Sequence, residues 1–199
     1  MFKTLPNILS LARVAIIPLI ALMILVPGKF AAWTALILFT IACITDYLDG
    51  YLARSMQEVS DFGKFIDPIA DKLLVATVLF VLVAANKITG MSVLPALIIL
   101  LREIVVSGLR EFLATIHVRL PVSKMAKWKT SVQMIALGFL IIGDSAPWTI
   151  PGHSIGLLGI WVAAIITVIT AWDYLYEGVL KILNNTRSTG STTIDNDDA

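Results

Sequence analysis

Apolar residues form six long runs along the chain, and short polar stretches separate them. Clear breaks fall at "VPGK", "NKITG" and "GDSAPWTIPGH", where Pro, Gly and polar residues cluster. Because a helix crosses the hydrocarbon of a bilayer with about 20 residues, the pattern predicts six transmembrane helices. They cover residues 5–26, 30–53, 65–85, 91–114, 128–143 and 155–175. We expect the fifth to begin earlier, near Lys124, and the sixth to extend to about Leu183.

The composition agrees with an all-α integral membrane bundle. Of the 199 residues 58% are hydrophobic, and the mean hydropathy is +0.88, whereas soluble domains are about 45–50% apolar. We therefore assign residues 1–183 to one membrane domain. The polar tail, residues 184–199, is predicted to be disordered and cytoplasmic. No nucleic-acid partner is expected.

The distribution of Lys and Arg predicts the orientation. The connections after the first, third and fifth runs carry only Lys29 and Lys87. The other side of the membrane carries Lys3, Arg54, Lys64, Arg119, Lys124, Lys127, Lys129, Lys181 and Arg187. Since cytoplasmic connections are enriched in Lys and Arg, both termini are predicted to face the cytoplasm.

Four aspartates stand where the second and third runs meet. Asp46 and Asp49 are three residues apart, and Asp67 and Asp71 are four apart, so each pair shares a helix face. A carboxylate in a span costs about 2.5–3.5 kcal/mol, and four would repel one another. Two divalent cations, Mg²⁺ or Mn²⁺, would neutralise them through hard oxygen ligands. The alternative is that Asp67 and Pro68 mark an ordinary helix start, with Asp67 as the N-cap.

The pattern D-x-x-D-G-x-x-A-R-x8-G-x3-D-x3-D resembles the signature of the CDP-alcohol phosphotransferase family. Its fixed positions here are Asp46, Asp49, Gly50, Ala53, Arg54, Gly63, Asp67 and Asp71. The resemblance implies a six-span fold, usually a homodimer. It also implies an enzyme that moves a phosphatidyl group from a CDP-linked lipid to an alcohol and releases CMP.

The resemblance also implies roles for these positions. Asp46, Asp49 and Asp67 would be metal ligands, while Asp71 would bind the second metal and act as the general base. The residues expected to hold the cytidine diphosphate are Asp46, Gly50, Ala53, Arg54 and Gly63.

Three further stretches resemble the branch of the family that uses glycerol 3-phosphate. They are "LPNILSLARVAIIPL", "REIVVSGLRE" and "SKMAKWKTSVQ". The substrates implied are CDP-diacylglycerol and sn-glycerol 3-phosphate, in a bacterial inner (plasma) membrane among its lipids. A phosphorylated acceptor suits basic side chains. Those expected to bind its phosphate, together with one Asn, are Arg102, Arg110, Lys124, Lys127, Asn7 and Arg13.

Several alternatives remain open from the residues alone. Arg102 could instead form a structural ion pair with Glu103 or Glu111. The positive-inside rule alone would explain Arg119 and Lys129. The acceptor could be inositol phosphate or serine, and a cation transporter could use the same acidic site.

Overall fold

The computed structural model describes residues 5–56, 61–116, 124–147 and 149–192. Within these ranges the side chains of residues 5–8, 47–56, 61–65, 67–68, 124–127 and 182–192 lie outside the description. The described part contains no β-strand. Its helices are α1 (Leu5–Leu25), α2 (Lys29–Met56), α3 (Asp61–Ala84), α4 (Val93–Thr115), α5 (Lys124–Ile142) and α6 (Gly152–Thr192), with short 3₁₀ turns η1 (Gly90–Ser92) and η2 (Gly143–Ser145).

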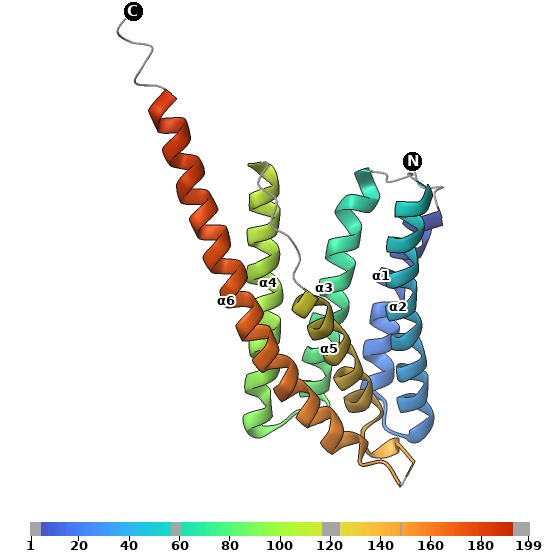
Figure 1. Ribbon diagram of the computed structural model, residues 1–199. Coiled ribbons are helices and arrows are strands. Elements are labelled where there is room, and N and C mark those ends of the chain that lie inside the picture. Colours follow the sequence, from blue (N-terminus) through green and yellow to red (C-terminus); the bar gives the residue numbers. More distant parts are fainter. Residues whose placement is uncertain (1–4, 57–60, 117–123, 148, 193–199) are drawn as a thin grey trace, which may run out of the picture.

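The helices form a bundle in which the chain reverses direction at each connection (Figure 1). Helix α1 packs against α2 and α3, while α6 packs against α4 and α5. Helix α5 also contacts α2 and so joins the two groups. The start of α1 and the end of α6 lie at the same end of the bundle, and α6 extends well beyond it (Figure 1).

The six predicted helices are all present, and two of their boundaries differ from the expectation. Helix α3 begins at Asp61, so Asp67 and Pro68 lie inside the helix and the N-cap interpretation of Asp67 is wrong. Helix α6 continues to Thr192, so residues 184–192 are helical where a disordered tail was expected. Helix α5 begins at Lys124, as predicted.

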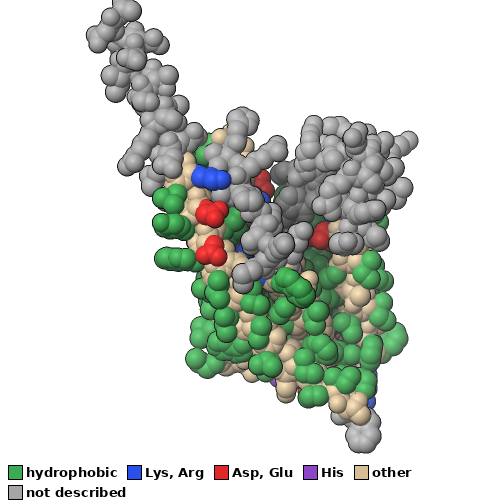
Figure 2. Space-filling view, in the orientation of Figure 1, with side chains coloured by type: hydrophobic (Ala, Val, Ile, Leu, Met, Phe, Trp, Pro, Cys, Tyr) green, Lys and Arg blue, Asp and Glu red, His purple; other side chains and the backbone are tan. Residues whose placement is uncertain are grey.

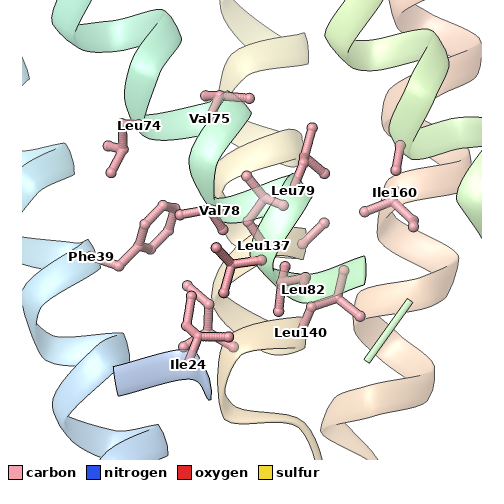
Figure 3. Close-up of a cluster of buried hydrophobic side chains, with 14 of the residues drawn as sticks. Ile24, Phe39, Leu74, Val75, Val78, Leu79, Leu82, Leu137, Leu140 and Ile160 are labelled. Atoms are coloured by element: carbon pink, nitrogen blue, oxygen red, sulfur yellow. The ribbon is translucent and has the colours of Figure 1, made fainter. Parts of the chain in front are cut away.

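The hydrophobic core lies in the middle of the bundle, where α2, α3 and α5 meet. Phe39 of α2 points toward Leu74 and Val78 of α3, and Leu137 of α5 lies beside them (Figure 3). Leu140 of α5 is fully buried in the same cluster. Since each helix buries only one apolar face here, its other apolar face must meet a different surrounding.

The lateral surface of the bundle is covered by apolar side chains (Figure 2). Phe30, Phe80, Trp128 and Trp172 are each more than 70% exposed. A soluble monomer rarely exposes an apolar surface of this extent, so lipid is the expected surrounding. Among the described residues, three stretches are long and apolar enough to cross a membrane: Lys29–Asp46, Gly90–Thr115 and Gly152–Lys181. The apolar stretch of α1, Leu9–Leu25, is shorter.

Polar contacts close the bundle at the end opposite the aspartates. Lys87 donates its Nζ to the carbonyl oxygen of Ile141. The Nε2 of His153 lies 2.9 Å from the carbonyl oxygen of Lys87 and donates to it. Burial lowers the pKa of Lys87, and the nearby carboxylate of Asp144 partly opposes this shift. These contacts tie the α3–α4 connection to the start of α6.

The close contact between α5 and α6 predicts a strong effect of a small substitution. A Cβ atom at Gly156 would lie 2.7 Å from Cγ of Leu140 and 2.9 Å from its backbone nitrogen. We therefore expect Gly156→Ala to lower the free energy of unfolding by about 1–3 kcal/mol through overpacking. Thermal unfolding in detergent micelles measures this loss. The matched control is Gly108→Ala, because a Cβ there meets no described atom within 4 Å. It should be neutral or stabilise by up to about 1 kcal/mol, and equal losses in both variants would contradict the packing argument.

Candidate active site

The acidic residues of α2 and α3 meet at Arg13 of α1. One nitrogen of Arg13, Nη1, lies 2.5 Å from Oδ1 of Asp46 and 3.1 Å from Oδ1 of Asp71. Asp46 and Asp71 are far apart in sequence, yet their carboxylates face the same point. The helical spacing placed each aspartate pair on one face of its helix, and one member of each pair contacts Arg13 here.

Burial at this point is uneven. The side chain of Arg13 is fully buried, whereas those of Asp46 and Asp71 are 39% and 49% exposed. A buried guanidinium is stable only where carboxylates compensate its charge. The guanidinium of Arg13 therefore lies inside the bundle, and the carboxylates of Asp46 and Asp71 lie between it and the surface.

The remaining members of the aspartate motif are placed only by their backbone. Asp46 and Asp49 lie within α2, and Asp67 and Asp71 lie within α3, so Asp49 follows Asp46 on one helix face and Asp67 precedes Asp71 on another. The other motif residues whose side chains lie outside the description are Gly50, Ala53, Arg54 and Gly63. Among the side chains that are described, no group of three or more potential metal ligands occurs.

A second polar cluster lies between α4 and α5. Lys129 donates its Nζ to Oε1 of Glu103, and the side chain of Lys129 is only 1% exposed. The other oxygen of Glu103, Oε2, lies 3.7 Å from Nη1 of Arg102. The explanation of Lys129 by the positive-inside rule is therefore wrong, because this lysine is buried and paired. No sequence signal separated it from its basic neighbours.

Arg102 and Arg110 keep different surroundings along α4. The Nε of Arg102 is buried and has no hydrogen-bond partner among the described residues. Arg110 is exposed, and its guanidinium carbon lies 5.8 Å from the ring centre of Tyr174 on α6, within range of a cation–π contact. Lys124 and Lys127 on α5 and Asn7 on α1 fall outside the described side chains.

An apolar cavity of about 460 Å³ lies between α2 and α5. Its lining includes Phe39 and Cys43 of α2 and Met134 and Phe139 of α5, and it reaches Pro147 beyond η2. Cys43 lies one helical turn before Asp46, so the cavity begins near the acidic site. Its lining suits hydrocarbon better than a polar solute.

The fold and the site together define a helical membrane-type bundle with a carboxylate pair at one end. The family model for CDP-alcohol phosphatidyltransferases matches residues 3–172. The chain therefore belongs to the CDP-alcohol phosphatidyltransferase family, and the resemblance based on the aspartate motif is confirmed. This membership favours an enzyme over the alternative of a cation transporter.

Relatives from several bacteria cover most of the chain. A protein of Rickettsia typhi is 45% identical over 172 residues, which cover 86% of this chain and 95% of the relative. A protein of Cereibacter sphaeroides is 38% identical over an alignment of 211 residues, which covers 88% of this chain and 96% of that relative. One of Bacillus subtilis is 37% identical over 182 residues, covering 85% and 92%. Each of the three is named CDP-diacylglycerol–glycerol-3-phosphate 3-phosphatidyltransferase.

Proposed function

We propose that the protein transfers the phosphatidyl group of CDP-diacylglycerol to sn-glycerol 3-phosphate and releases CMP. Family membership supports the reaction type, and the names of the relatives support both substrates. Within this chain, the observation that carries the proposal is that Asp46 and Asp71 both contact the guanidinium of Arg13 while their carboxylates stay partly exposed. A carboxylate pair there suits a reaction between a bilayer lipid and a solute.

Two divalent cations, Mg²⁺ or Mn²⁺, fit the donor set of Asp46, Asp49, Asp67 and Asp71. The fit is supported by Arg13, whose positive charge already lies between oxygens of Asp46 and Asp71. Carboxylate oxygens are the ligands that these hard cations prefer. When bound, the cations would offset the charge of the diphosphate and stabilise CMP as it leaves.

Asp71 would act as the general base. It would accept the proton of the acceptor hydroxyl as the hydroxyl oxygen attacks the β-phosphorus of the lipid substrate. The new oxygen–phosphorus bond forms while the bond to the oxygen between the two phosphates breaks, and CMP leaves with that oxygen. Asp46, Gly50, Ala53, Arg54 and Gly63 would hold the cytidine diphosphate during this step.

The phosphate of the acceptor would be bound by basic residues from three helices. Arg102 supports this assignment, because its buried Nε has no described partner and can donate to a phosphate oxygen. The full set proposed is Arg102, Arg110, Lys124, Lys127, Asn7 and Arg13. Arg13 must then divide its donors between the acceptor and the carboxylates of Asp46 and Asp71.

The same proposal covers the membrane arrangement. All six helices would cross the inner (plasma) membrane of a bacterium, with both termini and the acidic site on the cytoplasmic side. Residues 1–183 would form the catalytic domain and residues 184–199 a cytoplasmic tail, and two chains would form a homodimer. The apolar lateral surface (Figure 2) supports a bundle that spans a membrane, and the start of α1 and the end of α6 at the same end (Figure 1) support termini on one side of it.

CMP release by the purified protein tests the proposed reaction. The protein is supplied with CDP-diacylglycerol, Mg²⁺ and one of four acceptors: glycerol 3-phosphate, inositol phosphate, serine or free glycerol. We expect release with glycerol 3-phosphate and none with free glycerol, since glycerol leaves the basic residues without an anion. Faster release with inositol phosphate or serine would overturn the acceptor assignment and leave the family assignment intact.

Replacing Arg102 tests the acceptor site itself. A charge-assisted hydrogen bond contributes about 1.5–3 kcal/mol, so Arg102→Ala should lower kcat/KM for glycerol 3-phosphate about ten- to hundredfold. The KM for CDP-diacylglycerol should change little. Steady-state kinetics with each substrate varied in turn measures the two effects. Lys29→Ala, at the opposite end of the bundle, serves as the control. An equal loss for both substrates would make Arg102 a structural residue.

A further inference from the structure

Four of the basic residues proposed for the acceptor phosphate come from two helices, α4 and α5. Arg102 and Arg110 lie on α4, while Lys124 and Lys127 lie on α5. Within the described part of the chain, α4 and α5 pack mainly against α6 rather than against each other. Helix α6 therefore sets their approximate relative position, and side chains that join α4 and α5 directly restrain it further.

Among the described side chains, an ion pair that is buried at its lysine makes this connection. Lys129 of α5 donates to Oε1 of Glu103 on α4, and the lysine side chain is almost fully buried. Removing one partner of a buried pair leaves an uncompensated charge, so such a pair resists separation. Lys129 follows Lys124 and Lys127 closely in sequence, and its anchor therefore restrains the start of α5.

The same carboxylate also reaches the acceptor side of α4. Oε2 of Glu103 lies 3.7 Å from Nη1 of Arg102, and the Arg102 side chain is 13% exposed. One carboxylate thus interacts with a lysine on α5 through one oxygen and with Arg102 through the other. Since Lys129 is buried, its ammonium group compensates the carboxylate of Glu103 within the protein.

We infer that Lys129 is a positioning residue for the acceptor's phosphate. Through Glu103 it holds α5 at a set distance from α4 and orients the guanidinium of Arg102. The inference rests on the proposed function, because it requires a phosphorylated acceptor bound between these two helices. It assigns Lys129 and Glu103 no contact with the reacting atoms.

Lys129→Met tests this role, because methionine keeps the length and apolar body of the side chain and removes the ammonium group. Small displacements of binding groups can cost about 10²-fold in rate. We expect KM for glycerol 3-phosphate to rise about ten- to hundredfold, while KM for CDP-diacylglycerol stays within about twofold. Lys129→Arg keeps the positive charge, so it should retain most of the wild-type affinity for the acceptor. The matched control is Lys181→Met, which makes the same change at an exposed position on α6.

Combining variants shows whether Lys129 acts through Arg102. In Lys129→Met/Arg102→Ala, the loss in acceptor kcat/KM should be smaller than the product of the two single losses. The inference would be overturned if the loss in the double variant equals the product of the two single losses. It would also be overturned by an unchanged acceptor KM in Lys129→Met, or by an equal rise in KM for both substrates.

If Lys129→Met does not fold, Lys129→Gln replaces it, since the amide still donates to Glu103. It should shift the acceptor KM in the same direction by a smaller factor, and no shift would overturn the inference.

The acceptor panel separates this inference from the proposed function. If the wild type uses inositol phosphate instead, the proposed function fails, and the inference is judged by the KM for inositol phosphate. If it uses serine, both fail, because no phosphate then needs positioning. If it uses glycerol 3-phosphate and Lys129→Met leaves that KM unchanged, only the inference fails.

Discussion

Asp71→Asn is expected to lower turnover by about 10²–10⁴-fold, the usual loss when a general base is removed. The amide has nearly the shape of the carboxylate but cannot accept the proton of the acceptor hydroxyl. A lost metal contact would add to the effect. Binding of CDP-diacylglycerol should stay largely intact, because the other proposed diphosphate contacts remain. Single-turnover CMP release measures the chemical step, and equilibrium binding of labelled CDP-diacylglycerol measures the substrate complex.

The matched control is Asp173→Asn on α6, an exposed aspartate outside the proposed site. It should keep wild-type turnover and wild-type thermal stability. Near-normal turnover in Asp71→Asn would move the base role to another residue. Loss of lipid binding in parallel with turnover would make Asp71 chiefly a ligand for the diphosphate or its metals.

Removing divalent cations is expected to abolish CMP release completely. The four proposed aspartate ligands and the diphosphate would otherwise repel one another, beyond what the charge of Arg13 beside Asp46 and Asp71 can offset. Chelation followed by dialysis, and then titration with Mg²⁺ or Mn²⁺, measures the dependence. Activity that survives chelation would contradict the two-metal proposal.

The metal-free protein should nevertheless stay folded. Arg13 contacts both Asp46 and Asp71, so part of the acidic charge is compensated from within the bundle. We expect thermal unfolding of the chelated protein to remain cooperative, with a midpoint that rises as cations are added. A midpoint that does not respond to Mg²⁺ or Mn²⁺ would argue that the aspartates do not bind these ions.

The helices and the aspartate motif could be predicted from the sequence because both depend on local order. An apolar run of sufficient length between Gly and Pro breaks is sufficient to predict a helix, and all six were found. The spacing of Asp46 and Asp49, and of Asp67 and Asp71, places each pair on one face of its helix whatever surrounds it. The motif also identified the family, which the matching family model confirmed.

Boundaries set by weak local signals were less predictable. Asp67 and Pro68 have the chemistry of a helix start, yet α3 begins earlier, at Asp61. Pro68 is the eighth residue of α3, beyond the first four N–H groups that have no partner within the helix. It therefore removes one backbone hydrogen bond, and the helix continues on both sides of it. The same dipeptide is thus found inside the helix where its chemistry suits a helix start, and sequence alone does not choose between the two places.

The sequence by itself determined the helices, their membrane character and the family, whereas the tertiary structure decided which charges meet. Arg13 was expected to bind a phosphate, and it lies between Asp46 and Asp71. In the sequence Lys129 was indistinguishable from Lys124 and Lys127 near it, and it is buried against Glu103. Both outcomes depend on how α1 packs on α2 and α3, and on how α4 and α5 are arranged on α6. Such contacts join residues distant in sequence, and helix periodicity carries no information about which faces of two helices come together.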